Sequence, residues 1–575
     1  MKKSDRKRGK SKGEFHLSRR AFLGGAATLT VAGAMLGLPG AAGAKTKPKP
    51  GGGIDPAAGG RRRSQAFRAR MDAATFNLQL PVPDHPTNGD EDLYPDRIGN
   101  FSKGLPHNNF GEVDPDAYDA FLNACASGRP ADFEAIPMGC PNPSQQRKLT
   151  NPQAGMAFDL EGTDSHQFTV RAAPAFASAE EAGESVELYW MALLRDVAFT
   201  DYATSPLAQD ACDDLITMSD FRGPKVGGNV TPATLFREDV PGGLAGPWIS
   251  QFLWLPTPFG VEFVERRMRT VLPGIDFITG ASDWLDVQKG CKPSVASQFD
   301  PVRRYIRNGR DLAQWVRIDV LFQAYFDAML ILLQPPDPSD PVTGGGLGCP
   351  VNPGNPYLGS QNQDGFGTFG GPYIATILAE VSTRALKSIW YQKWFVHRRL
   401  RPEAFGGRTH HKIANGRPYP IHDDVLNSDA IAEVFSNHGT YFLPQAYPEG
   451  SPLHPSYGAG HATVAGACVT ILKALFDETF VIPNPVVASA DGLSLVPYVG
   501  TDAGSLTVGG ELNKLAVNVA TARNIAGIHW RTDGIESMRL GEALAISVLR
   551  DQRGCYNEDF GGFTFTKFDG TTITV

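Results

Sequence analysis

The stretch that most constrains the fold is His-Pro-Ser-Tyr-Gly-Ala-Gly-His at residues 454–461, followed by the small-residue run at 462–467. A proline and two glycines permit a tight turn, and the small residues that follow are typical of a closely packed helix. We therefore expect His461 at a helix N-terminus, where unpaired amides and the helix dipole favour an oxyanion and an imidazole can exchange protons near neutral pH. Alone, such a Gly-His pair is more often a turn with a capping residue than a catalytic site.

Two basic residues precede this motif at a spacing that lets both reach one anion. Residues 372–399 carry apolar side chains at helical spacing, and Pro402 disfavours helical backbone at Arg401, so a helix should end there. Lys393 and Arg401 lie eight residues apart, so a helix would hold them within roughly 12 Å along its axis and on neighbouring faces. The alternative is a solvated basic face, which is the commoner role of such a run.

A further arginine, histidine and aspartate follow the motif. Residues 510–527 predict a helix, and Gly527 permits a break that turns Arg523 and His529 inward together. His529 and Asp533 lie four residues apart. If the next helix has begun there, the carboxylate can bond the imidazole and fix its tautomer. The alternative is a helix-terminal histidine with an exposed aspartate.

Together these segments supply the groups that a multiply charged oxyanion, such as phosphate or vanadate, would need. Arginine forks match tetrahedral oxyanions bidentately, lysine adds a point charge, and histidines can bond the central atom or carry protons. The candidate site residues are Lys393, Arg401, Arg523, Gly460 through its N–H, His454, His461, His529 and Asp533.

Three separated patterns carry a resemblance to a known family. They are Lys-x7-Arg-Pro, then His-Pro-Ser-Tyr-x-x-Gly-His, then Arg-x5-His-x3-Asp, in this order over residues 366–550. The arrangement resembles the vanadium-dependent haloperoxidases, within the larger group that includes type-2 phosphatidic acid phosphatases and bacterial acid phosphatases. The seven-residue spacing from His454 to His461 and the run Phe-Gly-Thr-Phe-Gly-Gly-Pro at 366–372 resemble the algal-type bromoperoxidases rather than the fungal-type chloroperoxidases.

The resemblance implies a cofactor, pentavalent vanadate, and a role for each site residue. His529 would be the axial ligand of vanadium, supported by Asp533, and His461 would be the acid–base group near the apical oxygen. The equatorial oxygens would be held by Lys393, Arg401, Arg523 and Gly460.

The resemblance also implies the substrates. Hydrogen peroxide would bind at the vanadate with Lys393 polarising it, and halide attack would give hypohalous acid, which halogenates an organic acceptor. His454 stands where bromoperoxidases carry a second active-site histidine, which favours bromide and iodide over chloride. Trp390 would line the halide approach, or equally be a core residue.

Many relatives have serine where this chain has Ala459, and the missing hydroxyl should weaken oxyanion binding by about 1–2 kcal/mol.

The N-terminus carries an export signal. Residues 1–44 have a basic start, paired arginines at Arg19 and Arg20, and an apolar run, as in twin-arginine signals; an ordinary secretory signal or a membrane anchor is the alternative. Residues 45–63 predict a disordered linker. We therefore expect a bacterial protein that acts in the periplasm or outside the cell, with no membrane span after signal removal. The net charge of -7 argues against nucleic acid as a partner.

The remaining chain predicts a mainly α fold, with helical bundles, long loops and a small C-terminal β-hairpin around Asp569-Gly570. We divide it into a helical, loop-rich region at 64–365 and a helical-bundle region at 366–575 that carries the vanadate site. Within these regions we predict amphipathic helices at 117–124 and 187–199, a single buried helix at 312–333, and loops from 403 to 453.

Cysteines and one loop allow two further expectations. Seven scattered cysteines lack zinc-like spacing, so one or two disulfides are plausible, but sequence cannot pair them. In the loop 335–371, oxygens of Gln361, Gln363 and Asp364 could hold calcium, although a solvated loop is the commoner case.

Three functions fit the site. The first is a vanadate-dependent bromoperoxidase, and the resemblance implies a homo-oligomer. The second is an acid phosphatase with His529 as nucleophile and His461 as leaving-group acid, which would not need His454 or the large N-terminal region. The third is a secreted phosphate- or vanadate-binding protein without turnover, which would not need His461 for proton transfer.

Overall fold

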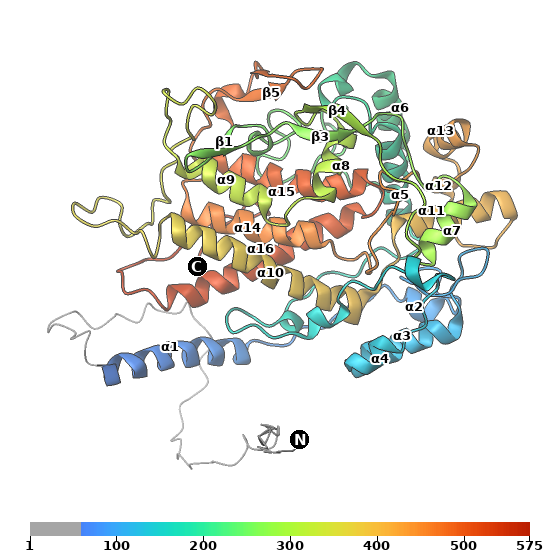
Figure 1. The fold of residues 1–575 in the computed structure, drawn as a ribbon, viewed down its shortest axis with the longest axis horizontal. Helices are drawn as coiled ribbons and strands as arrows, with labels where there is room; N and C mark the ends of the chain where they lie inside the picture. The colour runs from blue at the N-terminus through green and yellow to red at the C-terminus, as the bar shows by residue number, and fades with distance from the viewer. Residues whose placement is uncertain (1–58) are drawn as a thin grey trace, which may run out of the picture. The chain divides into compact units, whose positions relative to one another are not determined.

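Two long helices, α14 (Gly460–Leu475) and α16 (Arg531–Arg553), lie against each other at the centre of the fold (Figure 1). A Cβ on Gly466 would lie 2.1 Å from the carbonyl oxygen of Met538, and one on Gly541 would lie 2.0 Å from that of Thr463. Only glycine allows the two backbones this close. The small-residue run after the motif therefore allows α14 to pack directly against α16.

The computed structural model describes residues 59–575, and Arg63–Val575 form one compact unit. The predicted signal, 1–44, and most of the predicted linker, 45–63, lie outside the described residues. The linker prediction is wrong at its end, because α1 already begins at Gly59. The other helices are α2 (Asp90–Leu93), α3 (Pro115–Ser127), α4 (Pro130–Glu134), α5 (Ala179–Leu193), α6 (Pro206–Leu215), α7 (Ala281–Gln288), α8 (Gly309–Arg317), α9 (Gln323–Leu333), α10 (Gly371–Tyr391), α11 (Pro402–Asn415), α12 (Asp423–Leu426), α13 (Asp429–His438) and α15 (Val508–Ile525).

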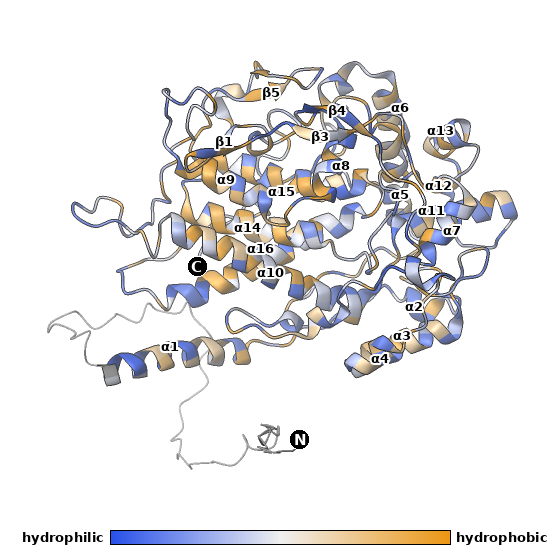
Figure 2. Cartoon of the chain, in the orientation of Figure 1, coloured by the Kyte–Doolittle hydropathy of each residue, from blue (hydrophilic) through white to orange (hydrophobic). Residues whose placement is uncertain are grey.

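The core is built around α14. Every residue of α14 except His461 is buried, and α10, α15 and α16 pack on it. Figure 2 shows apolar residues gathered on these helices and on α9. Gly460 at its N-terminus is buried as well, so the site there lies within the unit rather than on its surface.

The mainly α prediction is confirmed, and the strands form only small two-stranded antiparallel hairpins. The predicted C-terminal hairpin is present as β7 (Thr564–Thr566) paired with β8 (Thr572–Thr574). The other pairs are β1 (Thr257–Phe259) with β2 (Glu262–Val264), β3 (Met268–Val271) with β4 (Phe299–Arg304), and β5 (Val486–Ala488) with β6 (Leu495–Pro497).

The prediction of a single buried helix at 312–333 is wrong. The segment forms α8, which ends at Arg317, and α9, which begins at Gln323. The intervening loop turns Ile318 and Val320 to solvent, while Asp319 bonds a histidine of α14. The break between the two helices lets the Asp319 carboxylate pair with His461, and burying a carboxylate without such a partner would cost free energy.

The prediction of loops throughout 403–453 is also wrong, because α11, α12 and α13 lie there. Pro402 ends the preceding segment and also starts α11 at its first position, where its missing N–H costs nothing. Gly406 and Gly407 weaken the local helix signal, yet both are needed. A Cβ on Gly407 would lie 1.9 Å from the Trp284 ring, and one on Gly406 would lie 2.7 Å from Leu443.

Several helix boundaries differ from the predictions. The helix predicted at 187–199 is α5, which begins at Ala179 and ends at Leu193, and the one predicted at 117–124 lies within α3. The helix predicted to run to 399 ends at Tyr391 and continues as a π-helical turn, Gln392–His397, that closes with Arg398 in the left-handed region. Sequence periodicity does not show such a turn, because it adds one residue to a helical repeat.

One of the predicted disulfides forms, between Cys140 and Cys291. It joins residues that are 151 positions apart, so it constrains the unfolded chain over a long loop. The other cysteines are free: Cys125, Cys212, Cys349 and Cys468 are buried, and Cys555 is exposed. Among the described residues, none of the helices combines the length and the apolar character that crossing a bilayer requires.

Candidate functional site

The structure brings the predicted site residues together where several segment ends meet. Lys393 lies in the π-helical turn after α10, and Arg401 is the N-cap of α11. Arg523 lies in the last turn of α15, and His529 lies between α15 and α16. Gly527 has φ +83° and makes the break between those two helices, as the sequence predicts.

Arg401 links two of the histidines. Its Nη1 donates to the carbonyl of Ile528 over 2.7 Å and lies 2.9 Å from Nε2 of His529. Its Nη2 lies 2.9 Å from Nδ1 of His454, and its Nε donates to the His454 carbonyl over 2.9 Å. The guanidinium is 1% exposed, so its orientation is fixed from all sides.

Lys393 is fully buried, and Nζ donates to the carbonyls of Pro455 and Ser456 over 2.8 and 2.9 Å. An ammonium has three donors, so one N–H remains for another acceptor. Burial, followed by the charge of Arg401, holds the pKa of Lys393 well below its usual range, although Asp533 opposes this. The pKa of Arg401 is lowered to about 9, first by burial and then by Arg523 against the opposing Asp533.

Arg523 completes the set of cations. Its Nη1 donates to the carbonyl of Val316 over 3.0 Å, and its Nε is buried with no hydrogen-bond partner among the described residues. Within residues 59–575, Lys393, Arg401 and Arg523 have no ion pair with a carboxylate. Three buried positive charges with no carboxylate in contact are costly, and a multiply charged oxyanion among them would offset that cost. The donor set therefore fits vanadate or phosphate.

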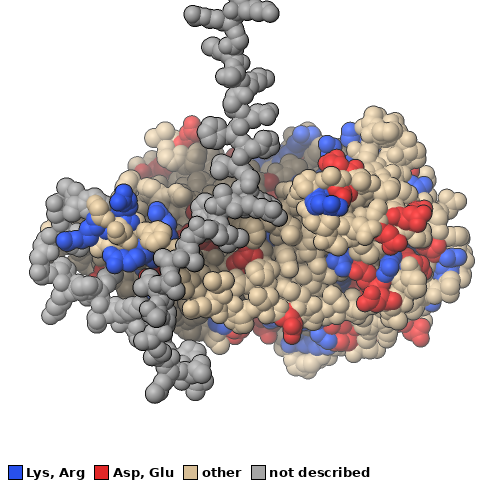
Figure 3. Space-filling model, turned by 90° about the horizontal axis from the view of Figure 1, so that it is seen from below, with Lys and Arg blue, Asp and Glu red and all other residues tan. Residues whose placement is uncertain are grey.

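This concentration of positive charge is internal. On the face of the molecule shown in Figure 3, basic side chains gather at one end, and elsewhere basic and acidic side chains are interspersed among uncharged residues. The local field of the site therefore comes from buried side chains, which solvent and salt screen weakly.

Asp533 sets the tautomer of His529. Its Oδ2 accepts from Nδ1 of His529 over 2.7 Å and from the Trp530 amide over 3.2 Å. An ionised carboxylate can only accept, so Nδ1 carries the proton and Nε2 carries a lone pair. Burial, followed by Arg401 and Lys393, holds the pKa of His529 well below its usual range, which keeps the ring neutral and able to bond a metal.

His454 is neutral for the same physical reasons. Its pKa is held well below the usual range by burial, then by Lys393 and Arg401. Trp390 lies beside it with ring centroids 4.8 Å apart, and Nζ of Lys393 lies 5.5 Å from the Trp390 ring. Trp390 is 8% exposed, so it forms part of the wall of the site.

His461 stands at the N-terminus of α14, as predicted, and is the most exposed of the site histidines. Its side chain is 20% exposed, and Nε2 lies 3.0 Å from Oδ1 of Asp319. Ala459 is the N-cap of α14 and no side chain caps the helix, so the first-turn amides around Gly460 stay available. A Cβ on Gly460 would lie 2.9 Å from the Trp390 ring, so only glycine fits.

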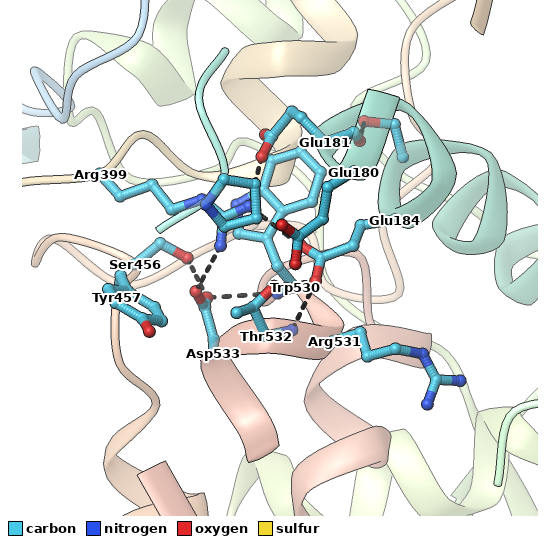
Figure 4. Close-up of polar contacts among 12 residues, drawn as sticks. Glu180, Glu181, Glu184, Arg399, Ser456, Tyr457, Trp530, Arg531, Thr532 and Asp533 are labelled. Atoms are coloured by element: carbon cyan, nitrogen blue, oxygen red, sulfur yellow. Dashed lines mark hydrogen bonds and ion pairs between the residues drawn. The ribbon is translucent and has the colours of Figure 1, made fainter. Parts of the chain in front are cut away.

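Sequence reasoning missed two groups of residues near the site. The first is Asp319, which lies within the apolar run at 312–333, and its charge in that run is its one signal in the sequence. The second group is Arg399 with Glu181 and Glu184 of α5, which lies behind Asp533 (Figure 4). The two glutamates are three residues apart and share one helix face, but nothing local connects them to a residue more than 200 positions away.

The loop with the predicted calcium ligands does not form a metal cluster among the described residues. Gln361, Gln363 and Asp364 are exposed, and Oδ1 of Asp364 accepts from the Phe366 amide over 2.9 Å. The calcium prediction remains a prediction.

Comparison with known proteins connects this geometry to one chemistry. The family described as the VCPO second helical-bundle domain matches residues 433–558. A vanadium-dependent bromoperoxidase of Corallina officinalis is 36% identical over 600 aligned positions, covering 89% of this chain and 98% of the relative. One of Ascophyllum nodosum is 34% identical, covering 90% and 93%. The homohexameric structure of the second vanadate-dependent bromoperoxidase of Ascophyllum nodosum superposes with a TM-score of 0.83 at 32% identity, covering 92% of this chain and 94% of that one.

Proposed function

The chain belongs to the vanadium-dependent bromoperoxidase family, and from this premise we propose that it oxidises bromide and iodide with hydrogen peroxide to hypohalous acid, which then halogenates organic acceptors. The observation that carries the proposal is the set of three buried cations, none with a carboxylate in contact, together with the unprotonated Nε2 of His529, which lies 2.9 Å from Nη1 of Arg401. Neither the phosphatase nor the binding-protein alternative has an observation of its own in its favour.

The residues of the site would divide the work as follows. His529 would bond vanadium through Nε2, and the oxygens would be held by Lys393, Arg401, Arg523 and the N–H of Gly460. Bound vanadate would supply a Lewis acid that activates hydrogen peroxide toward a halide. Lys393 has one N–H left after its two carbonyl bonds, so it can bond an oxygen of the bound peroxide.

His461 would move protons at the mouth of the site. Its partner Asp319 orients the ring from the loop between α8 and α9. An imidazole held by a carboxylate can take a proton from incoming peroxide and return it to a leaving oxygen. His454 and Trp390 would shape the place where the halide approaches, with His454 neutral and able to donate one hydrogen bond.

Purified protein assayed with bromide, hydrogen peroxide and a phenolic acceptor tests the function. We expect bromination that requires orthovanadate and no turnover of p-nitrophenyl phosphate. Phosphate ester hydrolysis without bromination would select the phosphatase alternative, and no activity in either assay would select the binding protein. Repeating the assay with iodide and chloride defines the halide range, which Ala459 leaves open.

Replacing Ala459 by serine should tighten oxyanion binding. The N-cap of α14 has no hydroxyl, and serine would add one donor beside the first-turn amides at almost the same volume. One hydrogen bond contributes about 1 kcal/mol, or about a fivefold lower dissociation constant for vanadate. Titration of the apo protein with orthovanadate measures this, with Ala459→Gly as the control that adds no donor. Equal affinities for the serine variant and the wild type would contradict the prediction.

Four finer proposals rest on sequence and family. We propose a bacterial protein exported by a twin-arginine signal in residues 1–44, and a homo-oligomer in solution. The regions 64–365 and 366–575 would be its main divisions. Calcium at Gln361, Gln363 and Asp364 would be an addition to vanadate, not a part of the reaction.

A further inference from the structure

Arg399 bonds Asp533 and joins it to two glutamates of α5 (Figure 4). We propose that Arg399, Glu181 and Glu184 act as a positioning unit, which fixes the orientation of Asp533 and thereby holds Nε2 of His529 ready to bond the central atom of the oxyanion. The inference rests on the proposed function for the identity of that oxyanion.

The contacts form one continuous buried chain. Nη1 of Arg399 lies 3.0 Å from Oδ1 of Asp533, and Nη2 lies 3.0 Å from Oε2 of Glu184 and also bonds Oε2 of Glu181. The side chains of these four residues are 0–7% exposed. The guanidinium also lies 4.7 Å from the Trp530 ring, so it cannot swing away.

These contacts leave Asp533 no freedom. Its two oxygens accept from four donors: Arg399, the Ser456 hydroxyl, the Trp530 amide and Nδ1 of His529. A carboxylate saturated in this way cannot rotate or take up a proton without breaking a bond. Since Oδ1 is held by Arg399 alone, the loss of that contact would leave Asp533 held only through Oδ2 and would weaken its hold on the ring that it orients.

The two glutamates balance the charge of Arg399. The site already holds three cations, and a fourth uncompensated charge would weaken the effect of Asp533 on His529. Burial raises the pKa of Glu184 to about 7 and that of Glu181 well above its usual range, and in both Arg399 opposes the rise. Arg399 therefore favours the charged forms of the two glutamates against the effect of their burial.

Arg399 also anchors the motif through its backbone. Its carbonyl accepts from the Ser456 amide over 3.0 Å, and the Ser456 carbonyl accepts from Nζ of Lys393 over 2.9 Å. One residue thus fixes both the partner of His529 and the loop that holds Lys393.

The chain offers a matched control on α16, the helix that carries Asp533. Arg531 is 4% exposed and bonds Glu187 and Glu238. In Figure 4 its side chain extends away from Asp533, and no hydrogen bond or ion pair connects it to Asp533 or His529 within the part of the chain that the structure describes. Arg531→Lys therefore changes an arginine that is buried and paired with two glutamates, as Arg399 is. It breaks none of the contacts of Arg399.

The test compares Arg399→Lys with Arg531→Lys in the full chain. A lysine keeps the charge but cannot bond Asp533 and the glutamates together. We expect Arg399→Lys to weaken vanadate binding to the apo protein by about 10- to 100-fold, as for loss of partners that orient metal ligands, and Arg531→Lys to leave it unchanged. Independently of vanadate, ¹⁵N NMR of histidine-labelled apo protein should show Nδ1-protonated His529 in wild type and mixed tautomers in Arg399→Lys, with His529→Gln assigning the signal.

Each outcome decides the proposal. It is overturned if Arg399→Lys keeps both wild-type affinity and a single tautomer, or if Arg531→Lys loses as much affinity. If Arg399→Lys does not fold, Glu184→Gln takes its place, because it keeps an acceptor for Thr532 but removes the charge. Mixed tautomers of His529 in this variant would support the proposal, and an unchanged tautomer would overturn it. If the wild type binds no vanadate, the proposed function fails, while the tautomer measurement still tests the positioning unit.

Discussion

Replacing His529 by alanine should abolish vanadate-dependent bromination and weaken vanadate binding by more than about 100-fold, because loss of a group that merely orients a ligand already costs up to that much. Nε2 of His529 is the ring nitrogen left with a lone pair, since Nδ1 is committed to Asp533. The cations Lys393, Arg401 and Arg523 would remain, so the variant should still bind vanadate weakly, as it would bind any oxyanion through charge alone. Vanadate titration and the bromination assay measure the two losses separately.

The control removes a different buried imidazole. His107 is 9% exposed, its Nε2 lies 2.9 Å from the Ser102 hydroxyl, and within residues 59–575 no hydrogen bond joins it to Lys393, Arg401 or Arg523. His107→Ala should lower the free energy of unfolding as any buried truncation does, yet keep vanadate affinity. Vanadate binding by His529→Ala at wild-type strength would remove His529 from the proposed ligand set.

The candidate site could be predicted from sequence because its residues follow local rules at segment ends. Pro402 forces Arg401 out of helical backbone, and Gly527 breaks the chain between Arg523 and His529. Small residues after His461 require a neighbouring helix at close range. Each rule positions one side chain at a terminus, and helix termini in a bundle meet at a common end.

What could not be predicted depends on contacts between distant segments. Arg398, Arg399 and Arg401 look alike in sequence, but only the structure shows Arg398 paired with Glu91, Arg399 with the α5 glutamates, and Arg401 without a carboxylate. The functions of these arginines differ because of their partners, and no periodicity carries that information. The sequence did not predict α11 for the same reason. Gly406 and Gly407 weaken its helical pattern, and only their close approach to Leu443 and Trp284 explains why glycines stand there.

Replacing His461 by glutamine should separate turnover from binding. Glutamine keeps a hydrogen-bonding group near Asp319 but cannot carry a proton, so we expect kcat for bromination to fall about 100- to 10,000-fold, the usual contribution of a positioned acid–base group. Vanadate affinity should fall far less, because His461 faces Asp319 and is not one of the buried cations. Steady-state bromination and vanadate titration of the same variant give the two numbers.

A histidine at another helix start provides the comparison. His422 is the N-cap of α12, lies 3.5 Å from Asp424 and is 31% exposed, so His422→Gln makes the same change in a similar setting away from the site. It should leave turnover unchanged. Asp319→Asn should lower kcat less than His461→Gln, and the double variant should be no slower than His461→Gln alone, because Asp319 would act only through the ring that it orients. If vanadate affinity and kcat fell together in His461→Gln, the ring would be holding the oxyanion, and a proton-transfer role for His461 would be refuted.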